Sequence, residues 1–273
     1  MHPPPSPPHR RAVLAGLVTL SPGLAMASAR TPHDPVRWLD YEARLKARLA
    51  DGGGGRFDRS IARDLLPATN DARAGVGAPP CLWDEDLAAA ARAHAADLAA
   101  RGYIEHISPE GFDPSHRLAV LARRRIGSAS ENIAYRRNTI ASTSANLMQV
   151  WRESRPHWTN LLNPTHHRAG FGVVTVGQKT YAVGRYGHLD GELSAPLPFR
   201  LHDDIELADA LSGAPPEIQG FNLSDPSDDR RVAEFAQGEA PALAPGVYQL
   251  GPRRRRDAGP WMDVLWGPIF VKL

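Results

Sequence analysis

The residues of this chain that could do chemistry are its 11 histidines, its single cysteine and its carboxylates. The sequence contains no G-x-S-x-G turn of a serine hydrolase, no H-E-x-x-H helix of a zinc protease and no reactive-cysteine signature. Local motifs therefore indicate no nucleophile with a convincing partner. Any reactive site has to be assembled from residues that lie far apart in the sequence.

Cys81 is the only cysteine, so the chain can form no intrachain disulfide. It follows Pro79-Pro80 and precedes Leu82-Trp83, an apolar setting in which a free cysteine behaves as a small buried hydrophobe. A catalytic thiol is the less favoured alternative. We expect Cys81 to lie in the core beside Trp83 and to resist thiol reagents until the protein unfolds.

An alanine-rich segment predicts a helix over about 85–101, which Gly102 stops. His94 falls on the apolar stripe of this helix, which favours a core histidine with a satisfied hydrogen bond over a ligand. The remaining histidines considered have no helical ligand spacing and are expected to be solvated: His116, His166, His167 and His188.

A second helix is predicted by the helical spacing of Leu147, Val150, Trp151 and Ser154. Pro156 forbids its continuation, so His157 is expected just past a helix end. Segments 169–176 and 180–188 alternate apolar and polar residues around a Gly-Gln turn, which predicts two antiparallel strands. Helices that flank an antiparallel sheet form an α/β/α sandwich, so we expect an α+β fold.

Several local motifs carry a family resemblance because they occur in a fixed order over about half of the chain. Together they resemble the motifs of bacterial CAP domains, the module of cysteine-rich secretory proteins, antigen 5 and plant pathogenesis-related proteins. In chain order they are Asn70-Asp71-Ala72-Arg73, Pro79-Pro80-Cys81-Leu82-Trp83-Asp84, Tyr103-Ile104-Glu105-His106, Glu131-Asn132-Ile133-Ala134, Trp151-Arg152-Glu153-Ser154, Pro156-His157-Trp158 and Gly170-Phe171-Gly172-Val173. One such motif is weak, but six or more in register are not coincidence. The resemblance implies a CAP-type sandwich over 57–190.

The resemblance also implies a cleft lined by two histidines and two glutamates, of which His106, Glu131 and His157 match here. The fourth member is missing from its usual place, which is Ser154 in this sequence. Glu153 lies one residue earlier, a rotation of about 100 degrees on a helix, and is expected to point elsewhere. Two imidazoles and a carboxylate suit zinc or another divalent metal, with positions left for water or an anionic ligand.

The cleft permits three interpretations. It is a binding site with an optional metal, a polar network that ties loops to the sandwich, or a metal-assisted, peptidase-like hydrolase in which Glu131 acts as base or as orienting partner of a histidine. We favour the binding module and assign no catalytic residue. Lipid, glycan and protein all remain open as the extracellular partner, and a fourth interpretation makes the CAP domain a carrier for a binding module at the C-terminus.

The first 29 residues have the composition of a targeting segment. Arg10-Arg11 precede an apolar stretch over 12–20, and Ala27-Ser28-Ala29 fits a small-residue cleavage site. The adjacent arginines and the mild hydrophobicity resemble a twin-arginine signal, although no Phe follows the pair. An uncleaved anchor is the less favoured alternative, since the apolar run is short. We therefore predict an extracellular or periplasmic protein with no stable membrane span after cleavage.

The rest of the chain divides by composition into three parts. Segment 30–56 predicts an accessory helix and a Gly-rich linker, 57–190 the CAP domain, and 191–273 a small all-β module with Pro-rich connections. The formal charge is only +2, and the arginine runs 123–125 and 253–256 lack interleaved aromatic residues. The sequence therefore argues against nucleic acid as a partner.

Overall fold

The computed structural model describes residues 34–137, 141–202, 205–239, 241–256 and 260–273. Its helices are α1 (Pro35–Asp51), the 3-10 turn η1 (Gly52–Gly54), α2 (Arg59–Ala74), α3 (Glu85–Arg101), α4 (Pro114–Leu121), α5 (Ser144–Arg152), α6 (Arg155–Leu162) and α7 (Ile205–Leu211). Its strands are β1 (Arg56–Phe57), β2 (Leu82–Trp83), β3 (Arg125–Ile126), β4 (Ala129–Arg137), β5 (Arg168–Val176), β6 (Lys179–Gly187), β7 (Gly191–Glu192), β8 (Arg200–Leu201), β9 (Ile218–Ser224), β10 (Arg231–Ala236), β11 (Gly246–Arg255), β12 (Met262–Val264) and β13 (Ile269–Lys272).

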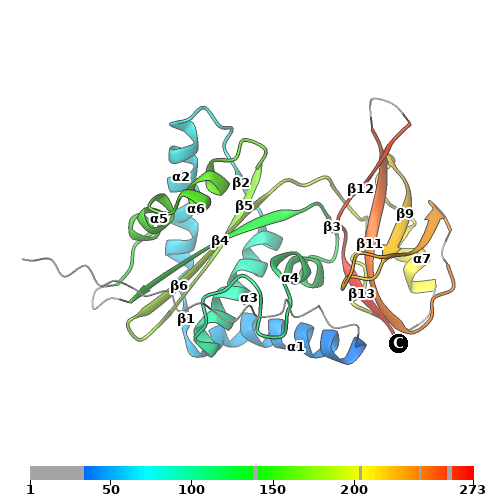
Figure 1. The fold of residues 1–273 in the computed structure, drawn as a ribbon, viewed down its shortest axis with the longest axis horizontal. Helices are drawn as coiled ribbons and strands as arrows, with labels where there is room; N and C mark the ends of the chain where they lie inside the picture. The colour runs from blue at the N-terminus through cyan, green and yellow to red at the C-terminus, as the bar shows by residue number, and fades with distance from the viewer. Residues whose placement is uncertain (1–33, 138–140, 203–204, 240, 257–259) are drawn as a thin grey trace, which may run out of the picture.

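A five-stranded sheet in the order β1-β5-β6-β4, with β2 paired to β5, forms the middle layer of the first half of the chain. Helices α2, α5 and α6 cover one face of this sheet, and α3 and α4 cover the other (Figure 1). Side chains alternate between the two faces, so Val173 packs in the cluster with α2 and α5 while Val174 packs against α3. The predicted α/β/α sandwich is therefore confirmed.

Local signals determine where its principal helix begins and ends. The Asp84 side chain accepts a hydrogen bond from the backbone N–H of Leu87 and caps α3, and Gly102 ends the helix with a positive φ of 70°. The alanines of α3 allow a close approach to β5. A Cβ on Gly172 would lie 2.3 Å from the backbone nitrogen of Arg92, so only glycine fits there.

The segment around Pro156 differs from the prediction. Helix α5 ends at Arg152, but a new helix, α6, starts at Arg155, and Pro156 occupies its first turn. Proline is tolerated there because the first N–H groups of a helix have no intrahelical partner. His157 therefore lies inside the first turn of α6, and not in a loop that follows a helix end.

Helix α1 and the glycine segment pack closely on the sandwich. Trp38, Tyr41 and Leu45 of α1 are buried in one cluster with Phe112 and with residues of β11 and β13. Gly53 has a φ of 66°, and a Cβ there would lie 1.9 Å from the carbonyl oxygen of Ala96 in α3. The predicted accessory helix thus joins the two halves of the core, and the predicted linker is fixed against α3.

The C-terminal region is rich in β-structure, as expected, and includes one short helix. Its six-stranded sheet has the order β10-β9-β11-β13-β8, with β12 paired to β11 (Figure 1). Helix α7 packs on one face of this sheet in a separate hydrophobic cluster that contains Leu207, Phe221 and Leu250. The predicted targeting segment 1–29 lies outside the described residues. Among the residues described, no helix has the length and apolarity needed to cross a membrane.

Candidate functional site

Glu131 is the centre of a buried charge network on β4, the edge strand of the central sheet. Its side chain is 1% exposed. Nδ1 of His94 lies 3.1 Å from Oε2, and Nδ1 of His106 lies 3.0 Å from Oε1. Since both carboxylate oxygens are engaged, Glu131 holds two imidazole rings in place at once.

Two buried arginines complete the network. Nη1 of Arg117 on α4 donates to Oε2 of Glu131 at 3.1 Å, and Nη1 of Arg185 on β6 donates to the same oxygen at 3.2 Å. Arg117 also donates to the backbone oxygen of His106, which fixes the loop that carries this histidine. Burial alone would raise the pKa of Glu131, but His94, Arg117 and the hydrogen bond from His106 hold it well below its usual value. Glu131 is therefore ionised.

The two histidines that contact Glu131 differ in their access to solvent. The side chain of His94 is fully buried, whereas that of His106 is 46% exposed. Burial and the nearby charge of Arg117 lower the pKa of His94, so this ring is neutral near pH 7. The prediction of a core histidine fits His94, although its Nε2 has no hydrogen-bond partner among the described residues.

His157 reaches the same strand from the opposite face of the sheet. Because neighbouring residues on β4 point to opposite faces, Glu131 faces α3 and α4 while Asn132 faces α6. The Asn132 amide donates to the backbone oxygen of His157 at 2.9 Å, and its own side-chain oxygen accepts from Asn160. Burial, followed by the charge of His106, lowers the pKa of His157. Its Nδ1 is buried without a hydrogen-bond partner in the described structure.

The predicted site residues are thus brought together in part. His106 and Glu131 are in direct contact, and His157 is linked to β4 through Asn132. No hydrogen bond joins the ring of His157 to either of the other two in the part of the chain that is described. Within the same ranges, no group of three histidine, cysteine, aspartate or glutamate side chains is arranged to hold a metal.

The phase of the helix around Trp151 agrees with the prediction for Glu153. Glu153 is exposed, and its carboxylate accepts a hydrogen bond from Gln149 at 2.8 Å. Ser154, which stands where the fourth cleft residue would be, is the N-cap residue of α6 and makes no side-chain capping bond. Glu131 therefore belongs to the buried charge network, and Glu153 lies outside it.

Sequence reasoning missed Arg117 and Arg185, both of which are buried. One signal was available for Arg185, which stands in the apolar stretch 181–186 of β6. Arginine is rarely buried without a partner, so a basic residue at such a position indicates a buried carboxylate nearby. Helix α4 was not predicted, and Arg117 gave no comparable signal.

Cys81 lies in the core as predicted. It is 1% exposed and belongs to the cluster that includes Leu65, Trp151 and, at its edge, Trp83. Burial raises the pKa of the thiol, although Arg73 opposes this. Cys81 is therefore a structural residue, and the alternative of a catalytic thiol has no support in its surroundings.

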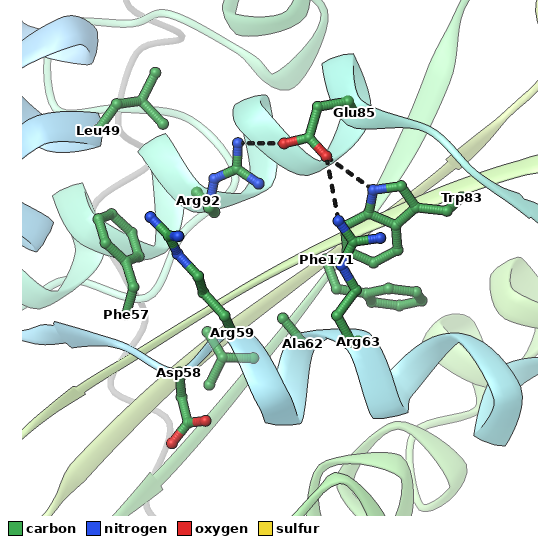
Figure 2. Close-up of a pocket in the computed structure, with 11 residues that line it drawn as sticks. Leu49, Phe57, Asp58, Arg59, Ala62, Arg63, Trp83, Glu85, Arg92 and Phe171 are labelled. Atoms are coloured by element: carbon green, nitrogen blue, oxygen red, sulfur yellow. Dashed lines mark hydrogen bonds and ion pairs between the residues drawn. The ribbon is translucent and has the colours of Figure 1, made fainter.

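A pocket of about 330 Å³ lies at the opposite edge of the sheet, between α2, α3 and β5. Figure 2 shows Glu85 bonded to Trp83, Arg63 and Arg92 on one side of it, with Arg59 extending from α2 on the other. Arg63 lies 4.0 Å from the centre of the Trp83 ring, a cation–π contact. The charges of this pocket are at the surface, in contrast to those around Glu131.

Comparison with known proteins places the site in a family. Residues 66–186 match the model of the cysteine-rich secretory protein (CAP) family. The uncharacterized protein YkwD of Bacillus subtilis is 30% identical over 118 residues, which cover 42% of this chain and 43% of that protein. This chain therefore spans less than half the length of that relative.

Two solved structures each resemble about half of the chain. An extracellular SCP-domain protein of Bacillus anthracis is 25% identical, with a TM-score of 0.41 over 47% of this chain and 40% of that one. An outer surface protein of Borrelia burgdorferi is 18% identical, with a TM-score of 0.44 over 50% of this chain and 99% of that one. The match to the family model agrees with the sandwich described above, and residues 66–186 therefore form a CAP domain of the cysteine-rich secretory protein family.

Proposed function

We propose that this protein is an exported binding protein whose CAP domain binds a polar ligand through His106 and His157, with a divalent metal as an optional component. The observation that carries the proposal is the His106–Glu131 contact of 3.0 Å, in which a buried carboxylate fixes a histidine that is 46% exposed. Contact through Nδ1 leaves Nε2 of His106 without a partner among the described residues. A fixed imidazole with one uncommitted nitrogen is suited to contact a ligand or a metal.

A metal in this site would have two candidate protein ligands, His106 and His157. Metal-binding histidines usually donate their other ring N–H to a carboxylate, which is the arrangement that Glu131 provides for His106. The buried Nδ1 of His157 lacks a partner in the described structure and is the second candidate. Both oxygens of Glu131 are already engaged, so Glu131 would orient a ligand and not coordinate the metal itself. A bound metal would act as a Lewis acid toward a ligand oxygen.

Export is proposed on the composition of residues 1–29, which match a cleaved targeting segment with Arg10-Arg11. Recovery of mature protein that begins near Arg30 would support it, whereas recovery of Met1 from exported material would contradict it. Replacement of both arginines by lysine tests the twin-arginine route, since it should leave precursor in the cytoplasm.

Zinc titration of the mature protein by calorimetry tests the cleft. We expect binding by the wild-type protein, and loss of that binding in His106→Asn and in His157→Asn. His167→Asn is the matched control, because His167 is an exposed histidine outside the network. Absence of zinc binding in the wild-type protein would remove the metal from the proposal. Equal zinc binding in all four proteins would mean that the two histidines do not form the site.

A further inference from the structure

A second hollow lies on the face of the C-terminal sheet opposite α7, far in sequence from His106 and Glu131. Its volume is about 340 Å³. Strands β9 and β11 form its floor, the segment 264–266 forms one wall, and the turn before β10 forms the rim. The residues that line it are Asn222, Ser224, Asp229, Arg231, Gln249, Gly251, Val264, Leu265 and Trp266.

The alternation of β9 explains why this face is polar. Phe221 and Leu223 are fully buried in the cluster with α7, so Asn222 and Ser224 point to the opposite face, which Gln249 shares. On the neighbouring strand, Gly251 lies opposite Asn222. A Cβ on Gly251 would lie 2.8 Å from Val264, so glycine at this position lets the segment 264–266 approach the sheet. The result is a polar floor with a wall that includes Trp266.

Two acceptors among the lining residues have no donor in the described structure. Oδ1 of Asn222 is buried and makes no hydrogen bond among the described residues. A buried acceptor without a donor is uncommon in native proteins, because an unpaired buried polar group is destabilising. The carboxylate of Asp229 forms no ion pair within the described ranges, and Asp229 has a φ of 58°, the one positive φ of a non-glycine residue there. Such strained residues cluster at binding sites.

The chemistry of the lining selects one class of ligand. Trp266 is 44% exposed and offers an indole surface at the wall, while the floor and rim offer acceptors. The charge of Arg231 is already taken by Glu234, which argues against an anionic ligand. A sugar ring has an apolar C–H face that packs on an aromatic ring and hydroxyl groups that donate to amide and carboxylate oxygens. We propose that this hollow binds an uncharged saccharide.

The proposal concerns a part of the chain outside the CAP domain and does not depend on the His106 cleft. It assigns ligand contact to the C-terminal region, with Trp266 as the stacking surface and Asn222 and Asp229 as acceptors. Of the two acceptors, Asn222 gives the clearer mutational test. Since its Oδ1 makes no hydrogen bond within the described structure, Asn222→Ala removes a contact to sugar without removing one from the fold.

The experiment is a titration of the full mature chain with cellohexaose, chitohexaose and maltohexaose, followed by tryptophan fluorescence and calorimetry. We expect at least one sugar to bind, and Trp266→Ala and Asn222→Ala each to weaken that binding at least about tenfold. Trp261→Ala is the control, because Trp261 is 68% exposed on the same hairpin but does not line the hollow. It should bind as the wild type does.

Two results would overturn the proposal. One is that none of the three sugars binds. The other is that Asn222→Ala binds as tightly as the wild type while its unfolding transition is unchanged, since the acceptor would then have no role. The zinc titration of the CAP cleft reports on a different part of the protein, so its outcome does not affect this test.

Discussion

The two edges of the central sheet carry carboxylates in opposite environments. At the β4 edge, Glu131 is 1% exposed and is surrounded by Arg117, Arg185 and two histidines. At the opposite edge, which β1 and β2 form and which is called the β1 edge below, Glu85 at the start of α3 is 61% exposed and is bonded to Arg92 and Trp83. Both have a pKa lowered from the usual value, although burial opposes the shift in each case. An ion pair with arginine therefore contributes more or less to stability according to how far the carboxylate is removed from water.

The largest expected effect is that of Glu131→Gln. This change leaves Arg117 and Arg185 buried without a compensating charge, which typically costs about 3–5 kcal/mol in free energy of unfolding. Urea denaturation of the purified protein measures it. Glu85→Gln is the control and should cost about 1 kcal/mol or less, because its pairs are exposed. Losses of equal size at the two edges would mean that burial does not distinguish them.

The β1 edge is stabilised instead by close backbone packing, which Gly53→Ala tests. A Cβ there would lie 1.9 Å from the carbonyl oxygen of Ala96, and the φ of 66° is unfavourable for alanine. Overpacking and the left-handed conformation together are expected to cost about 3 kcal/mol. Gly54→Ala is the control, since Gly54 has a φ of 78° but nothing within 4 Å of the added Cβ. It should cost only about 1–2 kcal/mol, for the backbone conformation alone. Equal losses in thermal unfolding would exclude the packing contribution.

Features of the fold and of the candidate site could be predicted where neighbouring residues in the sequence determine them, and not where tertiary contacts do. Helix α3 was predicted because Asp84 and Gly102 cap it, and the hairpin of β5 and β6 because Gly177 has the positive φ of 56° that its turn needs. Pro156 was misjudged because proline both ends one helix and begins another. The contact of His106 with Glu131 followed from family resemblance, whereas Arg117 and Arg185 enter the site only through tertiary pairing.

As the pH falls, the protein should lose stability at the β4 edge before it does so at the β1 edge. His166 is 7% exposed, against the expectation of a solvated histidine, and it contacts Ser130 and Asn160. Burial and the charge of Arg73 lower its pKa to about 4. Because the folded pKa lies below the unfolded value of about 6.5, the stability is complete above pH 6.5 and is lost as the pH falls toward 4. The loss from this group at pH 5 is about 2 kcal/mol.

The variant His166→Gln isolates this contribution. Glutamine does not titrate, so the free energy of unfolding of the variant should change less between pH 6.5 and pH 5 than that of the wild-type protein. His167→Gln is the control, because His167 is exposed on the same loop and should keep the wild-type slope. A slope in His166→Gln as steep as in the wild-type protein would assign the acid loss to other groups.

The smallest effect is expected for Arg59→Ala, a change at the β1 edge. Arg59 lines the pocket of Figure 2, and among the described residues it has no ion-pair partner. The nearby carboxylates are engaged elsewhere, since Asp58 pairs with Arg56 and Glu85 with Arg92. Loss of an exposed, unpaired cation should change the free energy of unfolding by no more than about 0.5 kcal/mol. Urea denaturation in low salt, where repulsion between neighbouring arginines is least screened, is the most sensitive measurement. A loss above about 1 kcal/mol in free energy of unfolding would show that Arg59 interacts with the other charges of the pocket. Charges at the exposed β1 edge would then contribute to stability more as the buried charges at the β4 edge do.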